Sequence, residues 1–253
     1  MRLLACDFDG TIFCRHTISQ DDLAAIRLWR ERGNLFGIVT GRGFMTLAKE
    51  LVRHPLEWDF LLCNNGALLL DADAQVAASR PLDQETASAL LASAGEIGCD
   101  SLAVFSGTDM HLIEGWGPWI NPVYTPPFIS MEEALQDEAV QISYGFCQRE
   151  RAFEVGESLA LAFRDRVSVQ CSLSVADMTA CGVGKASGIA WACQVNGWEP
   201  EGILAVGDDG NDVDMLAAYQ GYAMEGADEY VRNAASGTVK SVAQLVSTMY
   251  DTL

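Results

Sequence analysis

The N-terminal part of the chain alternates between short apolar runs and stretches with the spacing of amphipathic helices. Buried strands are predicted at 3–8, 35–39 and 60–63, because each is a short apolar run that polar residues bring to an end. Between the first two strands, Ser19 followed three residues later by Asp22 predicts the start of a helix. Strands that alternate with helices in this way indicate a parallel α/β sheet.

The pattern changes near Pro81, where this alternation stops. Residues 82–178 contain an aromatic and proline-rich segment, 116–127, together with separate predicted helices and strands. The predicted helices lie near 83–96 and 150–164, and the predicted strands near 101–105, 140–146 and 167–171. This mixture is typical of an α+β domain.

After the insertion the alternation returns, with a predicted helix from Lys185 and a predicted strand at 203–206. We therefore expect two domains. A core with a parallel sheet would be formed by 1–81 and 179–253, and an α+β cap would be formed by 82–178.

The composition is that of a globular chain with a substantial core, since 49% of the 253 residues are hydrophobic and 20% are charged. The 35 acidic residues against 16 basic ones give a formal net charge of −19. So acidic a chain repels polyanions, which argues against nucleic acid and anionic membranes as partners. A small anionic substrate stays possible, because a metal ion and two basic side chains can reverse the charge locally.

The eight cysteines are widely spaced and include no CxxC pair, which favours reduced thiols over a disulfide framework. No apolar segment of the signal-peptide type follows Met1. No apolar run approaches the roughly 20 residues that a membrane-spanning helix needs. We therefore expect a cytoplasmic protein that is not embedded in a membrane.

Four polar clusters occur where predicted core strands end or a core helix begins. They are Asp7-Phe8-Asp9-Gly10-Thr11, Thr40-Gly41-Arg42, Lys185, and Gly207-Asp208-Asp209-Gly210-Asn211-Asp212. Each cluster alone is compatible with ordinary loop or helix-cap chemistry. Because open parallel sheets bind ligands at the carboxyl ends of their strands, we expect the four clusters to meet in one site.

Together the clusters supply the parts of one reaction. Asp7 and Asp208 on neighbouring strand ends would repel each other unless a cation joined them, and Mg²⁺ prefers such oxygen ligands. Asp9 lies close enough along the chain for one carboxylate to attack phosphorus while another handles a proton. The Thr40 hydroxyl and the Lys185 ammonium would hold the remaining phosphoryl oxygens. The set predicts phosphoryl transfer through an aspartyl phosphate.

In sequence and in order, the four clusters resemble the four motifs of the haloacid dehalogenase (HAD) superfamily. The resemblance covers 1–81 and 179–253, and the insertion is similar to the type-2 cap of Cof-type sugar-phosphate phosphatases. Asn64-Asn65-Gly66-Ala67 is similar to the NGA segment of that subfamily. The stretch Tyr222-Ala223-Met224-Glu225-Gly226-Ala227 resembles its VAMGNA stretch, with Glu-Gly in place of Gly-Asn. The resemblance implies a Rossmann-like α/β core with an inserted α+β cap.

The resemblance also implies roles for the four matching carboxylates. Asp7 would be the nucleophile and a metal ligand. Asp9 would be the general acid/base, and its main-chain carbonyl would also reach Mg²⁺. Asp208 would be a further ligand, and Asp212 would support the metal or its waters. A carboxylate at position 9 favours phosphate esters over haloacids or phosphonates as substrates.

By the same resemblance, Thr40 and Lys185 would hold the phosphoryl group beside a phosphate site lined by Gly41, Arg42 and Asn211. We expect Mg²⁺-dependent hydrolysis of small phosphomonoesters, with sugar phosphates as the implied substrates. A phosphomutase or phosphotransferase would use the same aspartyl phosphate with a second hydroxyl as acceptor. A receiver-like phospho-acceptor is a remoter alternative, because receivers are shorter and carry the aspartate on a middle strand. The sequence leaves the particular ester and the oligomeric state open.

Overall fold

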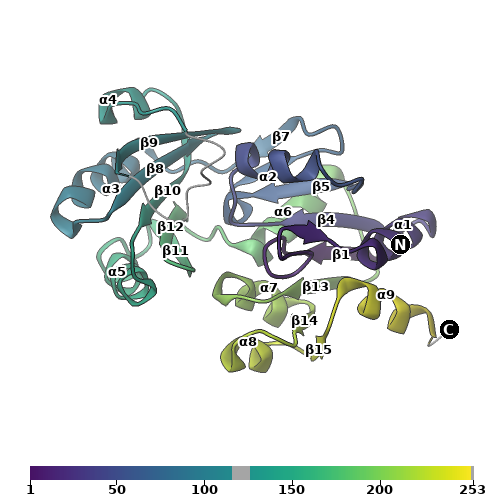
Figure 1. Ribbon diagram of the computed structural model, residues 1–253. Coiled ribbons are helices and arrows are strands. Elements are labelled where there is room, and N and C mark those ends of the chain that lie inside the picture. Colours follow the sequence, from purple (N-terminus) through teal and green to yellow (C-terminus); the bar gives the residue numbers. More distant parts are fainter. Residues whose placement is uncertain (116–125, 252–253) are drawn as a thin grey trace.

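The computed structural model describes residues 1–115 and 126–251. Across these residues the strands form an eight-stranded, a five-stranded and a two-stranded sheet. The two larger sheets lie side by side, each with helices of its own (Figure 1). In the same residues no helix has the length and apolar character needed to cross a membrane.

The eight-stranded sheet has the order β15-β14-β13-β1-β4-β5-β6-β7. In that order the strands span Gly237–Val239, Gln220–Met224, Ile203–Gly207, Leu3–Cys6, Leu35–Val39, Phe60–Cys63, Leu68–Leu70 and Val76–Ser79. The strands from β15 to β5 pair in parallel, whereas β6 and β7 add an antiparallel edge. Every residue of β1 is buried, as expected of a central strand covered on both faces.

Helices cover both faces of this sheet. Leu4 and Cys6 of β1 belong to a hydrophobic cluster with the helices α1 (Gln20–Glu31), α2 (Phe44–Leu51) and α9 (Val242–Asp251). The alternate residues of β1 join a second cluster with the helices α6 (Lys185–Asn196), α7 (Val213–Ala218) and α8 (Glu229–Ala234). Because side chains of a strand alternate between its faces, the two clusters lie on opposite sides of the sheet. This arrangement leaves the ends of the strands free to carry a site.

The five-stranded sheet is antiparallel, with the order β11-β12-β10-β8-β9. In that order its strands span Val167–Ser172, Val175–Ala180, Ala139–Gly145, Ser101–Ser106 and Asp109–Gly115. The helices α3 (Gln84–Ile97) and α5 (Arg149–Ala162) pack on one face, and the short α4 (Met131–Ala134) lies near β9. The opposite face turns toward the strand ends of the larger sheet (Figure 1).

The structure confirms the α/β core with an α+β insertion. The predicted strands at 35–39 and 60–63 match β4 and β5, and Ser19 caps α1 by accepting a hydrogen bond from the Asp22 amide. The first predicted strand is too long, because β1 ends at Cys6 where its pairing with β13 stops. All eight cysteines are free thiols.

Several elements were not predicted. The strands β9 and β12 mix polar with apolar residues, and the short β15 and the hairpin of β2 (Phe13–Cys14) and β3 (Thr17–Ile18) give little pattern. Strand β12 runs to Ala180, past the predicted cap boundary at residue 178. The division at 82–178 therefore remains a proposal. Of the aromatic segment 116–127, residues 116–125 lie outside the described residues.

Candidate active site

Three neighbouring strands end at the same edge of the larger sheet, and each is followed by a polar side chain. Asp7 follows β1, and its amide donates to the Val206 carbonyl of β13 at 2.9 Å. Asp208 follows β13 itself, while Thr40 follows β4 with its amide bonded to the Leu62 carbonyl at 2.8 Å. The hydrogen-bond ladder of the sheet thus continues to Asp7 and Thr40, whereas the Asp208 amide donates to the Asp212 carboxylate.

Lys185, the first residue of α6, lies beneath these strand ends and is fully buried. Its Nζ donates to Asp7 Oδ1 at 2.6 Å and to Asp212 Oδ1 at 2.5 Å. Burial alone would lower the pKa of Lys185, but Asp212 and Asp7 outweigh it and raise this pKa above its ordinary value. The ammonium is therefore held in its charged form, as a buried ion needs partners on both sides.

Asp212 organises the loop that carries Asp208. Its second oxygen accepts hydrogen bonds from the amides of Asp208 at 2.8 Å and Asp209 at 3.0 Å. Glycine is needed at 207, because a Cβ there would lie 2.4 Å from the Asp212 carboxyl carbon. Gly10 is required for two reasons, since its φ is +78° and a Cβ would lie 2.1 Å from Asp208 Oδ2.

The carboxylates of Asp7, Asp208 and Asp212 form a cluster suited to a metal ion, with one ligand atom from each within 4.8 Å of the others. Burial, followed by the charge of Asp212, raises the pKa of Asp7 well above its ordinary value. The same two causes raise the pKa of Asp208 to about 6. Crowded carboxylate oxygens at a strand edge fit a hard divalent cation such as Mg²⁺, which would relieve their repulsion.

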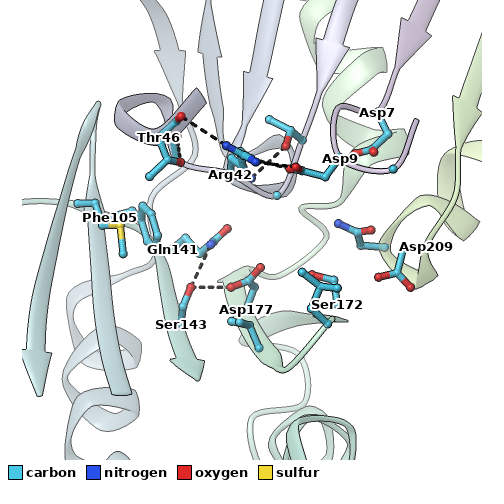
Figure 2. A pocket seen from close by; sticks show the side chains of 18 of the residues that line it. Asp7, Asp9, Arg42, Thr46, Phe105, Gln141, Ser143, Ser172, Asp177 and Asp209 are labelled. Carbon is cyan, nitrogen blue, oxygen red and sulfur yellow. Dashed lines mark hydrogen bonds and ion pairs between the residues drawn. The ribbon is translucent and has the colours of Figure 1, made fainter. Parts of the chain in front are cut away.

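Asp9 does not join this cluster through its carboxylate. Both of its oxygens accept hydrogen bonds from the guanidinium of Arg42, at 2.6 Å from Nε and 2.6 Å from Nη2. The Arg42 amide in turn donates to the Thr40 hydroxyl oxygen at 3.1 Å. Burial lowers the pKa of Arg42, but the hydrogen bonds and charge of Asp9 outweigh burial and raise it. Figure 2 shows this pair at the edge of a cavity.

The cavity has a volume of about 360 Å³ and lies between the two large sheets. Its core wall, as we name it, consists of Asp7, Asp9, Gly10, Thr40, Gly41, Arg42, Gly43, Thr46, Asp208, Asp209 and Asn211. Its cap wall consists of Phe105, Met110, Pro126, Gln141, Ser143, Ser172, Leu173, Val175 and Asp177. The candidate residues Asp7, Asp9, Thr40, Gly41, Arg42, Asp208 and Asn211 thus meet at one cavity, while Lys185 and Asp212 support it from below.

Asn211 lines the cavity, but its amide is already engaged. Its Nδ2 donates to Asn65 Oδ1 at 3.0 Å, and Asn65 Nδ2 donates to Asp177 Oδ2 at 3.0 Å. The Asn65 side chain therefore bridges the core to the five-stranded sheet. Gly41 packs beside this bridge, because a Cβ at 41 would lie 3.1 Å from Asn65 Oδ1.

Sequence reasoning missed the polar members of the cap wall. Gln141 and Ser143 of β10 and Asp177 of β12 are all buried and connected by hydrogen bonds (Figure 2). Burial raises the pKa of Asp177 to about 6, although Ser143 and Asn65 oppose the shift. The available signal was weak: polar residues alternate with apolar ones at 141 and 143 in β10, and at 177 and 179 in β12.

Comparisons with known proteins agree with this geometry. The sequence model of the haloacid dehalogenase-like hydrolases matches residues 4–246. The chain is 26% identical to pyridoxal phosphate phosphatase YbhA of Escherichia coli, with 97% of each chain covered. It is 24% identical to 5-amino-6-(5-phospho-D-ribitylamino)uracil phosphatase YcsE of Bacillus subtilis, covering 93% of this chain and 88% of that one.

Among solved structures, a sugar phosphatase of HAD subclass IIB superposes with a TM-score of 0.81 at 24% identity, covering 100% of this chain and 99% of that one. That likeness shows the same fold, including the inserted cap. The order of the motifs, their meeting at one strand edge and the match over 4–246 lead to one conclusion. The chain belongs to the haloacid dehalogenase-like hydrolases.

Proposed function

We propose that this protein is a Mg²⁺-dependent phosphatase that hydrolyses small phosphomonoesters through an aspartyl phosphate on Asp7. The observation that carries the proposal is the position of that carboxylate. Asp7 lines the cavity and accepts a hydrogen bond from the buried Lys185. It also belongs to the acidic cluster with Asp208 and Asp212. The family match and the two phosphatases among the relatives support it.

In the first step Asp7 attacks phosphorus and the leaving alcohol departs. The hydrogen bond from Lys185 occupies Oδ1 and fixes the carboxylate, so the other oxygen is available as the nucleophile. Because Lys185 is charged and buried, it also offsets the charge of Asp7 when an anionic phosphate approaches. The Thr40 hydroxyl, at the same edge, donates to a phosphoryl oxygen.

A metal fits the acidic cluster, where Asp7, Asp208 and the main-chain carbonyl of Asp9 would hold it and Asp212 would support them. When bound, Mg²⁺ neutralises charge on the phosphoryl oxygens. The hydrogen bonds from Asp212 to the loop amides and from Thr11 to Asp208 keep the carboxylates in place.

Asp9 serves as the proton donor to the leaving oxygen and then as the base that activates water. In the structure both of its oxygens are bonded to Arg42, so it must exchange one of these bonds to reach the leaving group. A phosphate fits the guanidinium fork as well as a carboxylate does. We therefore infer that the substrate phosphate competes for Arg42 and frees Asp9.

The test is phosphate release from a panel of phosphomonoesters, with Mg²⁺ and with EDTA. We expect Mg²⁺-dependent release from the wild type and a loss of at least about a thousandfold in Asp7→Asn, because an amide oxygen cannot form the acyl phosphate. Asp137→Asn, an exposed position on the cap surface, is the matched control and keeps full activity.

Full turnover by Asp7→Asn would overturn the mechanism. Isomerisation of a phosphosugar without release of phosphate would instead identify a mutase with the same aspartyl phosphate. For the cellular setting we propose the cytoplasm, an assignment that the eight free thiols support.

A further inference from the structure

The polar part of the cap wall is an oriented chain of hydrogen bonds, which together with Asn65 we call the acceptor cluster (Asn65, Gln141, Ser143 and Asp177). Gln141 Nε2 donates to Ser143 Oγ at 3.0 Å, and the Ser143 hydroxyl donates to Asp177 Oδ1 at 2.5 Å. From the other side Asn65 donates to Asp177 Oδ2 at 3.0 Å. Every bond of this chain runs toward the carboxylate, so the donors on both oxygens favour the charged form of Asp177.

Asp177 still has unused capacity toward the cavity. Each carboxylate oxygen can accept about two hydrogen bonds, and only one is made to each oxygen by the described residues. The side chain lines the cavity, and Figure 2 shows its carboxylate turned into the open space. The wall therefore offers an acceptor to a ligand. Burial has already raised the pKa of Asp177 to about 6, so a donor from the ligand would relieve an unfavourable buried charge.

Apart from Ser172, the rest of the cap wall is apolar. Phe105 and Met110 stand beside the acceptor cluster, and Pro126, Leu173 and Val175 complete the wall. Phe105 is fixed against the core, because a Cβ on Gly43 would lie 2.5 Å from its ring. A leaving group with many hydroxyls would lose water at these positions without replacement hydrogen bonds, which is unfavourable. A flat ring would instead bury apolar area there.

We propose that the substrates of this enzyme are phosphomonoesters whose leaving alcohol carries an aromatic ring with a hydrogen-bond donor at its edge, and that Asp177 recognises this donor. The inference rests on the proposed phosphatase function and names its substrate class. It departs from the sugar phosphates that the sequence resemblance implies. The donor is a ring hydroxyl or a protonated ring nitrogen, and the ring lies against Phe105 and Met110.

The experiment compares kcat/KM for four esters with Mg²⁺: benzyl phosphate, 3-hydroxybenzyl phosphate, pyridoxal 5′-phosphate and glucose 6-phosphate. In the wild type we expect each donor-bearing aromatic ester to exceed benzyl phosphate by about tenfold or more, and benzyl phosphate to exceed the sugar ester. In Asp177→Asn we expect the advantage of the donor-bearing esters to shrink by roughly ten- to hundredfold, because a hydrogen bond to a charged acceptor is lost.

Two further variants separate recognition from structure. Ser143→Ala removes one donor to Asp177, so we expect the same ratio to shrink by a smaller factor. Asp137→Asn, the same change on an exposed part of the cap, leaves all ratios as in the wild type. Thermal unfolding of each variant checks that it is folded.

The outcomes are distinct. If Asp177→Asn lowers kcat/KM equally for all four esters, Asp177 only joins the cap to Asn65 and the inference is wrong. A wild type that prefers glucose 6-phosphate also overturns it. If no ester releases phosphate in the wild type, the proposed function fails instead, whatever the cap wall recognises.

Discussion

The two walls of the cavity differ in how many charged side chains line them. The core wall is rich in charges that are partly compensated over short distances: Arg42 pairs with Asp9, and Lys185 beneath the wall lies between Asp7 and Asp212. In the cap wall a single carboxylate, that of Asp177, stands among neutral and apolar side chains. The difference indicates that the two walls have separate tasks. The core wall makes and breaks the bond to phosphorus, whereas the cap wall selects the leaving group.

The largest effect on this comparison is expected from the variant Lys185→Met. Removing the ammonium leaves Asp7 and Asp212 buried without their counter-charge, so we expect the free energy of unfolding to fall by about 3–5 kcal/mol and turnover to be lost. Lys240→Met, on the exposed surface, is the control. Urea denaturation measures the difference. A Lys185 variant as stable as the wild type would show that the core wall is not held by its charges.

On the cap wall, the matching test is the dependence of stability on pH. The folded-state pKa of Asp177, about 6, lies above its ordinary value of 3.8, so the folded protein binds this proton more tightly than the unfolded chain. The contribution of this protonation to the free energy of unfolding is complete below pH 4 and is lost as the pH rises through 6. Asp177→Asn lacks this loss. We expect its stability relative to the wild type to rise by up to about 3 kcal/mol between pH 4 and 7.

Denaturation curves of both proteins at pH 4, 5, 6 and 7 make the measurement. Other groups, Asp208 among them, titrate in the same range, but they do so in both proteins and cancel in the difference. If the difference in free energy of unfolding between the two proteins stayed constant across this pH range, ionisation of Asp177 would not destabilise the fold. The contrast between the two walls would then weaken.

Metal binding should distinguish the walls without any assay of activity. At a Mg²⁺ concentration a hundred times its Kd, we expect about 2.7 kcal/mol of stabilisation, measured as a rise in Tm. Asp208→Asn removes a carboxylate of the cluster and should abolish the rise, whereas Asp177→Asn should keep it. Equal loss in the two variants would show that the two walls are not independent.

The smallest effect is expected at the outer contact between helix α5 and two loops of the core. Arg149, at the start of α5, lies 3.4 Å from Asp209 and 3.7 Å from Asp228, and all three side chains are partly exposed. We expect Arg149→Gln to change the free energy of unfolding by less than about 1 kcal/mol. Arg151→Gln, whose ion pair with Glu154 stays within the helix, is the control. A larger loss would mean that charge also holds the cap in place.

The same contrast explains how far the sequence could predict the site. On the core wall the chemistry follows the ends of parallel strands, and the alternation of strands and helices is enough to bring Asp7, Thr40 and Asp208 to one edge. The order of motifs along the chain then indicates Lys185 and Asp212 as their companions. The sequence did not reveal the two hydrogen bonds from Arg42 to Asp9, because this pairing depends on side-chain directions across a loop.

The cap wall was beyond prediction for a physical reason. Ser143 meets Asp177 only because β10 and β12 are neighbours in register, and strand order in an antiparallel sheet depends on contacts far apart in sequence. Asn65 reaches both sheets from a backbone with φ of 54°, in the left-handed region, which sequence pattern does not indicate. The mixed polarity of β12 also concealed where the inserted segment returns to the core.

The path of the chain has an evolutionary consequence. Every residue of the cap wall falls within 105–177, one uninterrupted stretch, whereas the core wall comes from 7–46 and 208–211 on either side of it. One exchange of contiguous sequence therefore replaces the whole surface that selects the leaving group and leaves the reacting residues untouched. Asn65, which meets Asp177, and Gly43, which packs against Phe105, lie outside that stretch and have to fit the new segment. Recombination of one contiguous segment is therefore enough to exchange the wall that faces the leaving group.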